Sequence, residues 1–311
     1  MARLTVRLAA AAVLALALAC GEEEGPSGKV PEHVGQWGAR GTGPGQFDSP
    51  YDVAAGPGGD VYVADRGNCR IQRFTADGDF VGAWGASGTQ PGDFNAPKGV
   101  ACDPVTGNVY VADTDNDRVQ YFTPDGSVLG TWGSYGTADG QFDGPAGVTV
   151  AANEQVYVAD TDNHRVQYFT AAGSFLGKWG AEGAGNGQFR RPYRVAVGLG
   201  GRTYVTECEG CRVQCFTAVG SFVNRWGAAG TGPGDFVEPM GVICDPAGAV
   251  FVADSGNDRV QFFSYAGAYF GEWGKPGAGI LNLDHPRGVA VGPDGRIYVA
   301  DCYNHRIQVY R

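Results

Sequence analysis

The stretch Val158-Ala159-Asp160-Thr161-Asp162-Asn163-His164-Arg165-Val166-Gln167-Tyr168-Phe169 is the clearest copy of a phrase that occurs six times in the chain. Its core is Asp-x-x-Asn-x-Arg, and other copies start at Asp65, Asp113, Asp254 and Asp301, with a degenerate copy at Glu207. Successive cores lie 48, 47, 47, 47 and 47 residues apart. A period of about 40–50 residues that carries several short strands is typical of a β-propeller, in which each repeat forms one blade.

Each repeat has further landmarks at fixed distances from this phrase. A Trp-Gly pair ends an apolar stretch, an apolar anchor follows ten positions after the Trp, and a proline comes three positions later. All six tryptophans occupy this one repeat position: Trp37, Trp84, Trp132, Trp179, Trp226 and Trp273. Alternating apolar residues between turn signals predict four strands per repeat, a to d, with strand d ending at the Trp.

The two ends of the repeat region predict how the ring closes. The chain stops at Arg311 after a strand c, whereas His33–Gly38 reads as a strand d with no blade before it. We therefore expect an all-β, six-bladed propeller over residues 33–311. The N-terminal strand should complete the last blade and cover two sheet edges.

This pattern of strands and anchors resembles the NHL repeat family, and the resemblance covers residues 33–311. It implies a six-bladed propeller with strand a along the central channel and strand d on the rim. It also implies that the d–a loops and the b–c turns share one face, around the mouth of the channel.

The first residues differ in composition from the repeats. Arg3 and Arg7 precede the apolar run Leu8–Leu18, which is too short to span a membrane and is typical of an export signal. Ala17-Leu18-Ala19-Cys20 followed by a Gly/Glu/Pro/Ser stretch resembles a bacterial lipoprotein signal. The resemblance implies a signal peptide over residues 1–19, lipidation of Cys20 and a linker over residues 20–32. An ordinary signal peptide with an incidental Cys is the alternative.

The polar residues of the phrase are interpreted as turn chemistry. We expect Asp to bond turn amides, Arg to reach a carboxylate or carbonyls, and Asn to occupy a position with positive φ, since Gly210 replaces it in the degenerate copy. The residue before the Arg reads, in order, Cys69, Asp117, His164, Cys211, Asp258 and His305, which indicates duplication of a three-blade unit. Neighbouring turns should lie about 10 Å apart, too far for shared ligands, so we expect no metal and no cofactor.

The cysteines allow a local cross-link. Cys208 and Cys211 are three positions apart across one turn, and export favours oxidation, so a disulfide between them is predicted. Cys69 and Cys302 occupy turn positions in blades that become neighbours on closure, which leaves a second bridge open. The Cys208, Cys211 and Cys215 spacing is not expected to be catalytic.

The two residues after each proline are the best candidates for a ligand site. Four blades keep Gly in the second place, whereas blades 1 and 4 carry Asp52 and Arg194, which should face each other across the channel. The candidate ligand-binding residues are Tyr51, Asp52, Lys98, Tyr193, Arg194, Met240 and Arg287.

These features favour a non-catalytic binding or scaffold module for a protein, peptide or glycan. The alternative is a propeller lyase or hydrolase related to the peptidyl-hydroxyglycine lyases, but no post-proline position holds the His of that pattern. A formal net charge of −10 disfavours nucleic acid and anionic lipid as partners. We expect an exported monomer anchored by lipid to the bacterial cell envelope, in the outer membrane where there are two membranes.

Overall fold

The computed structural model describes residues 29–311. The predicted signal peptide, residues 20–28 of the linker and the lipidation site Cys20 lie outside the described residues. No helix among residues 29–311 is long and apolar enough to cross a membrane.

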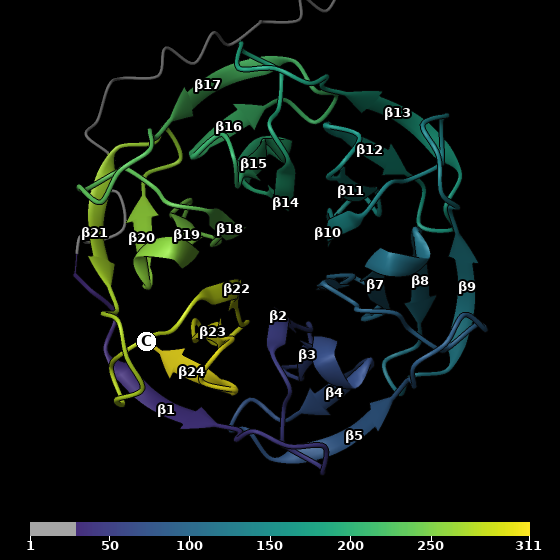
Figure 1. Ribbon diagram of the computed structural model, residues 1–311, viewed down its shortest axis with the longest axis vertical. Coiled ribbons are helices and arrows are strands. Elements are labelled where there is room, and N and C mark those ends of the chain that lie inside the picture. Colours follow the sequence, from purple (N-terminus) through teal and green to yellow (C-terminus); the bar gives the residue numbers. More distant parts are fainter. Residues whose placement is uncertain (1–28) are drawn as a thin grey trace, which may run out of the picture.

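The chain forms a ring of six four-stranded antiparallel sheets around a central channel, as predicted (Figure 1). The inner strands a are β2 (Pro50–Ala55), β6 (Gly99–Cys102), β10 (Pro145–Val150), β14 (Pro192–Val197), β18 (Pro239–Cys244) and β22 (Pro286–Val291). Strands b are β3 (Val61–Asp65), β7 (Val109–Asp113), β11 (Val156–Asp160), β15 (Thr203–Glu207), β19 (Val250–Asp254) and β23 (Ile297–Asp301).

The outer half of each blade consists of strands c and d. Strands c are β4 (Arg70–Phe74), β8 (Arg118–Phe122), β12 (Arg165–Phe169), β16 (Arg212–Phe216), β20 (Arg259–Phe263) and β24 (Arg306–Tyr310). Strands d are β5 (Phe80–Trp84), β9 (Val128–Trp132), β13 (Phe175–Trp179), β17 (Phe222–Trp226), β21 (Tyr269–Trp273) and β1 (His33–Trp37). Short 3-10 turns follow four strands: η1 (Arg66–Asn68), η2 (Thr114–Asn116), η3 (Leu199–Gly201) and η4 (Ser255–Asn257).

The ring closes where the sequence predicted. β1 pairs antiparallel with β24, so the last sheet has the order β1-β24-β23-β22 (Figure 1). The backbones of Glu32 and Arg311 extend this pairing by exchanging two hydrogen bonds of 2.8 Å. The N-terminal strand therefore occupies the d position of blade 6 and pairs the free edge of β24.

The core consists of apolar side chains packed between neighbouring sheets. The anchor predicted ten positions after each tryptophan is fully buried in every blade: Phe47, Phe94, Phe142, Phe189, Phe236 and Leu283. At the closing junction, the Trp37 ring lies 5.8 Å from that of Phe74 and 5.9 Å from that of Tyr298. The closing strand thus contributes a large aromatic side chain to the interface between blades 6 and 1.

The Asp of the repeated phrase is the centre of a buried hydrogen-bond network. In blade 3, Asp160 Oδ2 accepts from Arg165 Nε (2.6 Å) and Gln167 Nε2 (3.1 Å), while Oδ1 accepts from the backbone of Asp143 (2.8 Å). Arg165 donates its other N–H groups to three carbonyls at residues 137–141 in the d–a loop. The network ties the b–c turn to the loop that enters the same blade, which makes it structural.

The expectation that the Asn adopts positive φ was wrong. The left-handed residue is the next one, for example His164 with φ 53°, and the same holds for Cys69, Asp117, Cys211, Asp258 and His305. Asn163 instead donates its side-chain amide to Asp160 and to the carbonyl of Gly136 (2.9 Å). The Asn is selected by these side-chain hydrogen bonds and not by its backbone conformation.

The degenerate copy in blade 4 carries two compensating changes. Glu207 replaces the Asp, and its carboxylate still accepts from Arg212 Nε (2.6 Å) and from the backbone of Arg190 (2.8 Å). A Cβ at position 210 would lie 2.6 Å from Glu207 Oε2. The Glu207 side chain, which is longer than Asp, therefore occupies the space that an Asn side chain at position 210 would need.

A double-mutant cycle on this pair tests that account. Glu207→Asp alone should cost about 1–3 kcal/mol because buried donors lose their acceptor, and Gly210→Asn alone should cost a similar amount through overlap. The free energy of unfolding of the double variant should lie within about 1 kcal/mol of that of the original protein, since the two positions are coupled. Chemical denaturation of all four proteins measures this coupling, and purely additive losses would contradict it.

A second set of hydrogen bonds joins neighbouring blades beside the channel mouth. The residue before each inner-strand proline has φ of 48–59°: Ser49, Ala96, Gly144, Arg191, Glu238 and His285. At four junctions its N–H is accepted by the variable residue of the preceding phrase: Gly144 to Asp117, Arg191 to His164, His285 to Asp258 and Ser49 to His305. Within residues 29–311, Cys69 and Cys211 accept no such bond, so the junctions of blades 1 and 2 and of blades 4 and 5 lack it.

Candidate functional site

The residues after the prolines converge on the channel mouth, where the inner strands begin. Tyr51, Asp52, Lys98, Tyr193, Arg194 and Arg287 all border one small space. Met240 adjoins it, in one apolar cluster with Tyr193, Ala146 and Cys208. The structure thus brings all seven predicted residues together; whether they bind a ligand stays a prediction.

Asp52 and Arg194 form a buried ion pair across the channel. They are 4% and 8% exposed, and Arg194 Nη1 donates to Asp52 Oδ2. Both also bond Val100 of blade 2: its N–H donates to Asp52 Oδ2 (2.8 Å), and its carbonyl accepts from Arg194 Nη2 (3.0 Å). Burial raises the pKa of Asp52 to about 6, although the Arg194 charge opposes the shift. The pair therefore links blades 1, 2 and 4.

The two tyrosines close the channel mouth beside this pair. The hydroxyls of Tyr193 and Tyr51 hydrogen-bond to each other, and Arg287 Nη1 donates to Tyr51 Oη (3.1 Å). Burial raises the pKa of both phenols, so both stay protonated at neutral pH. The space left among the lining residues is about 10 Å³, which a single water molecule fills. Among residues 29–311, these side chains therefore form a closed floor at the channel mouth.

Cationic side chains surround Tyr51 on this floor. The Arg287 guanidinium lies 5.0 Å from the centre of the Tyr51 ring, and that of Arg66 lies 5.5 Å from it. The Nε atoms of Arg66 and Arg287 are buried without a hydrogen-bond partner. Burial lowers the pKa of Lys98, the third cation at this edge. We call Arg66, Lys98 and Arg287 the mouth cations; none forms an ion pair within the described residues.

Two residues of this surface, Arg66 and Tyr303, were not predicted from sequence. Arg287 also lies 5.8 Å from the ring of Tyr303, which is 50% exposed. The centre of the Tyr303 ring lies 4.5 Å from that of His285. Tyr303 and Arg66 occupy positions in the b–c turns, where the repeats differ freely. The positive charge of Arg66 is the one sequence feature that could have identified it, since no other blade has a cation directly after the Asp or Glu of the phrase.

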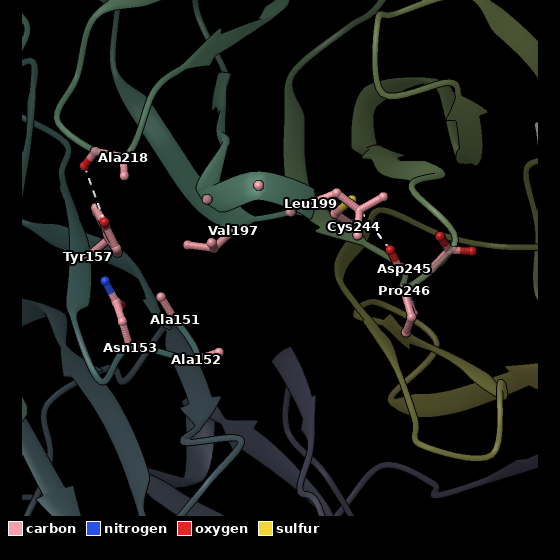
Figure 2. Close-up of a pocket in the computed structure, with 13 residues that line it drawn as sticks. Ala151, Ala152, Asn153, Tyr157, Val197, Leu199, Ala218, Cys244, Asp245 and Pro246 are labelled. Atoms are coloured by element: carbon pink, nitrogen blue, oxygen red, sulfur yellow. Dashed lines mark hydrogen bonds between the residues drawn. The ribbon is translucent and has the colours of Figure 1, made fainter. Parts of the chain in front are cut away.

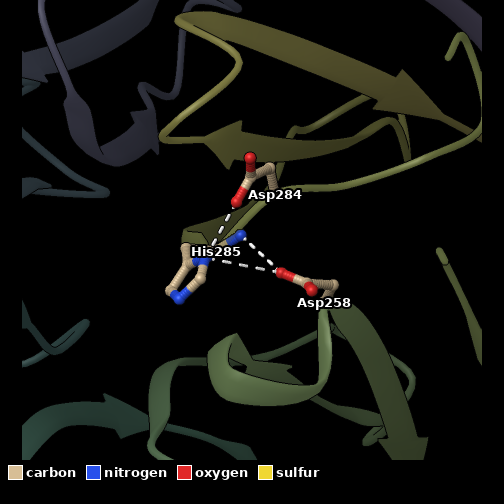
Figure 3. Close-up of side chains that lie close together, drawn as sticks. All are labelled: Asp258, Asp284 and His285. Atoms are coloured by element: carbon tan, nitrogen blue, oxygen red, sulfur yellow. Dashed lines mark hydrogen bonds and ion pairs between the residues drawn. The ribbon is translucent and has the colours of Figure 1, made fainter. Parts of the chain in front are cut away.

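A carboxylate–histidine cluster lies between blades 5 and 6 (Figure 3). His285 Nδ1 lies 2.8 Å from Asp284 Oδ1 and 3.5 Å from Asp258 Oδ1. Asp258 also accepts the backbone N–H of His285 at 2.7 Å. These hydrogen bonds account for the convergence of the three side chains and assign the cluster to the blade junction.

The predicted disulfide between Cys208 and Cys211 is not formed in the structure, where both are free thiols. Each sulfur points at a backbone carbonyl: Cys208 Sγ at that of Arg191 (3.4 Å) and Cys211 Sγ at that of Cys208 (3.7 Å). Cys69 and Cys302 are also free. Burial raises the pKa of the Cys208 thiol to about 11, so this group stays protonated and weakly nucleophilic at neutral pH.

Comparison with protein families identifies NHL repeats in three of the six blades. The matched residues are 47–74, 142–169 and 283–310. Each match runs from the buried anchor to the last residue of strand c. Among curated proteins, no sequence matches the chain.

Solved structures share the fold at low sequence identity. A gluconolactonase from Xanthomonas campestris matches with a TM-score of 0.64 and 13% identity, over 92% of this chain and 99% of its own. A streptogramin B lyase matches with a TM-score of 0.59 and 13% identity, over 85% and 94% of the two chains. A chain from a nidogen–laminin complex matches with a TM-score of 0.57 and 14% identity, over 79% and 86%. Such neighbours include enzymes and binding proteins, so they establish the fold alone. The chain is a six-bladed β-propeller that carries NHL repeats.

Proposed function

We propose that the propeller is a non-catalytic binding or scaffold module that holds an acidic protein, peptide or glycan at the channel mouth. The observation that carries the proposal is the closed floor of Tyr51 and Tyr193, bordered by the mouth cations. Arginine and tyrosine are the side chains that most often dominate binding energy at interfaces. A carboxylate would complement the charge of the mouth cations through charge-assisted hydrogen bonds.

The alternative function is a propeller lyase or hydrolase, as in two of the structural neighbours. Catalysis on a small substrate requires a pocket that surrounds the reacting atoms. A space of about 10 Å³ at the mouth supports surface binding over that alternative. Stoichiometric metal in the purified protein, together with lyase or lactonase turnover, would decide for the enzyme.

Charge-neutralising variants test the binding surface with defined probes. A labelled oligoglutamate and an oligogalacturonate should bind, whereas an oligolysine should not. Arg66→Gln/Lys98→Gln should weaken acidic-probe binding about tenfold or more, and added salt should weaken the original protein's binding. The matched control is Lys178→Gln/Arg225→Gln, which removes two charges from β13 and β17 on the outer rim. Equal affinity of both double variants, measured by fluorescence anisotropy, would remove the mouth from consideration.

The proposal extends to where the protein acts in the cell. We propose that lipid on Cys20 anchors an exported propeller to the cell envelope, on the strength of the resemblance of residues 1–20 to a lipoprotein signal. Cys20→Ala should move the protein from the membrane fraction to the soluble extracytoplasmic fraction. Unchanged membrane association of this variant would contradict the anchor.

A further inference from the structure

An apolar pocket lies on the face opposite the channel mouth, among the a–b turns of blades 3, 4 and 5 (Figure 2). Its volume is about 500 Å³, and its walls include Ala151, Val197, Leu199, Ala218 and Pro246. This volume is within the range of small-molecule sites, which are concave, mainly apolar and carry a few polar groups.

The polar groups lie at the two ends of this pocket. Figure 2 shows Asn153 and Tyr157 at one end and Asp245 at the other, with Val197 and Leu199 between them. One oxygen of Asp245 accepts from the backbone of Ala249 (2.7 Å), and Figure 2 shows the carboxylate directed away from Val197 and Leu199. A carboxylate at the end of an apolar pocket repels anions.

Leu199 separates this pocket from a second hollow of about 260 Å³, which is bordered by Arg202, Tyr204 and Tyr265. Leu199 is 53% exposed and Tyr265 50% exposed, and the nearby Val219 is 69% exposed. Leu199 and Tyr265 thus present apolar surface to solvent at the hollows, and Val219 follows the pocket residue Ala218 in the chain. Exposed apolar surface gathered in this way marks binding sites in soluble proteins.

The internal duplication provides a comparison, because blades 6, 1 and 2 carry different side chains at the equivalent positions. There the surface is held by ion pairs: Arg296 to Asp77 (2.6 Å) and Arg73 to Asp60 (2.7 Å). The equivalent positions in blades 3 to 5 are Gln155, Val219, Cys215 and Arg202. Two turn prolines differ likewise, with Pro57 replaced by Leu199 and Pro124 by Tyr265.

The two halves of the ring differ at this face in side chains and also in backbone. The blade 4 turn contains η3, which has no counterpart in the blade 1 turn. Val219 and Leu199 are also largely exposed, so they contribute little to the core. We infer that blades 3 to 5 form a binding site for an uncharged, mainly apolar small molecule.

Binding of Nile red, a neutral apolar fluorophore, tests the inference on the full-length protein. We expect saturable binding of one dye per chain, and weaker binding of the anionic dye anilinonaphthalene sulfonate. Leu199→Gln should weaken Nile red binding about five- to tenfold by removing an apolar wall. Ala152→Trp should abolish it by filling the pocket from an exposed turn position.

The matched control is Val105→Gln, which changes an equally exposed apolar residue of the blade 2 a–b turn, outside the pocket. It should bind Nile red as the original protein does, and all variants should keep the original melting temperature. Equal loss in Val105→Gln, or unchanged binding in both pocket variants, would overturn the inference. A concentration-dependent dimer that Leu199→Gln dissociates would overturn it too, because the occupant would then be a second copy of the chain.

Discussion

Deleting residues 29–38 is expected to destabilise the propeller by about 5 kcal/mol or more and to lower its melting temperature by at least about 10 °C. The deletion removes β1, which leaves the free edge of β24 unpaired and takes Trp37 out of the interface between blades 6 and 1. Loss of a large aromatic side chain from a core costs about 3–5 kcal/mol on its own, and the lost strand pairing adds to that. Thermal and chemical unfolding measure the effect.

Two comparisons separate ring closure from simple loss of contacts. Deleting only residues 29–32 should cost little beyond the Glu32–Arg311 hydrogen bonds. Trp37→Ala should cost about as much as Trp132→Ala, since both tryptophans end a strand d and pack against a Phe of the next blade. A peptide of residues 29–40 added to the truncated protein should restore stability. An unchanged melting temperature in the truncated protein would contradict closure by β1.

Replacing Arg194 with Met is expected to cost about 3–5 kcal/mol at pH 8, because it leaves the buried carboxylate of Asp52 without its partner. Asp52→Leu/Arg194→Met should recover most of that loss, since an apolar pair of similar volume needs no compensation. Lys98→Met is the control at the same mouth and should cost less than about 1 kcal/mol. Urea unfolding of the four proteins gives these differences.

The cost of Arg194→Met should depend on pH. The folded-state pKa of Asp52 is about 6, above its ordinary value of 3.8. A carboxyl with a raised pKa stabilises the fold fully below its unfolded-state pKa, and this contribution is lost as pH rises through the folded-state pKa. Without the guanidinium, that folded-state pKa rises further, so the loss extends into the alkaline range. The variant should therefore be less destabilised at pH 5 than at pH 8, and an equal cost at both would contradict this account.

Most of the fold follows from spacing that is visible in the sequence. The tryptophans, the anchors and the unmatched strand at His33–Gly38 predicted all six sheets and the closure between β1 and β24. The prediction of positive φ for the Asn was wrong because Gly210 is not an isolated exchange. The coupled change at Glu207 explains it through side-chain volume, which a backbone argument does not consider.

The fully buried glutamines of strand c, such as Gln167, received no role from sequence. A polar residue in an alternating strand is expected to face solvent. Gln167 is buried because the d–a loop folds over it, so that Gln141 O accepts from its amide at 2.6 Å and Gly140 N donates to it at 2.9 Å. Such burial depends on a loop 26 residues earlier in the chain.

The sequence predicted which residues meet at the candidate site, but not that their side chains fill the channel mouth. The post-proline positions placed Asp52 and Arg194 opposite each other, and the structure has them in contact. Whether facing side chains leave an open channel or fill it depends on the ring diameter and on rotamers, which repeat spacing does not specify. The apolar pocket escaped prediction for a similar reason, since its walls come from turns of three different blades.

The hydrogen bonds donated by the residues before the prolines are present at four of the six blade junctions. The junctions of blades 1 and 2 and of blades 4 and 5 lack these bonds, and they divide the ring into two arcs of three blades. Other hydrogen bonds join the blades there, from Val100 N to Asp52 Oδ2 (2.8 Å) and from Thr206 Oγ1 to the Met240 carbonyl (2.6 Å). The Asp52–Arg194 pair connects blade 1 with blade 4, and therefore spans from one arc to the other. The ion pair is therefore a direct contact between the two arcs, in addition to their two junctions. A partner that binds at the channel mouth would contact both arcs at once, because Tyr51 and Arg287 belong to one arc and Lys98 and Tyr193 to the other.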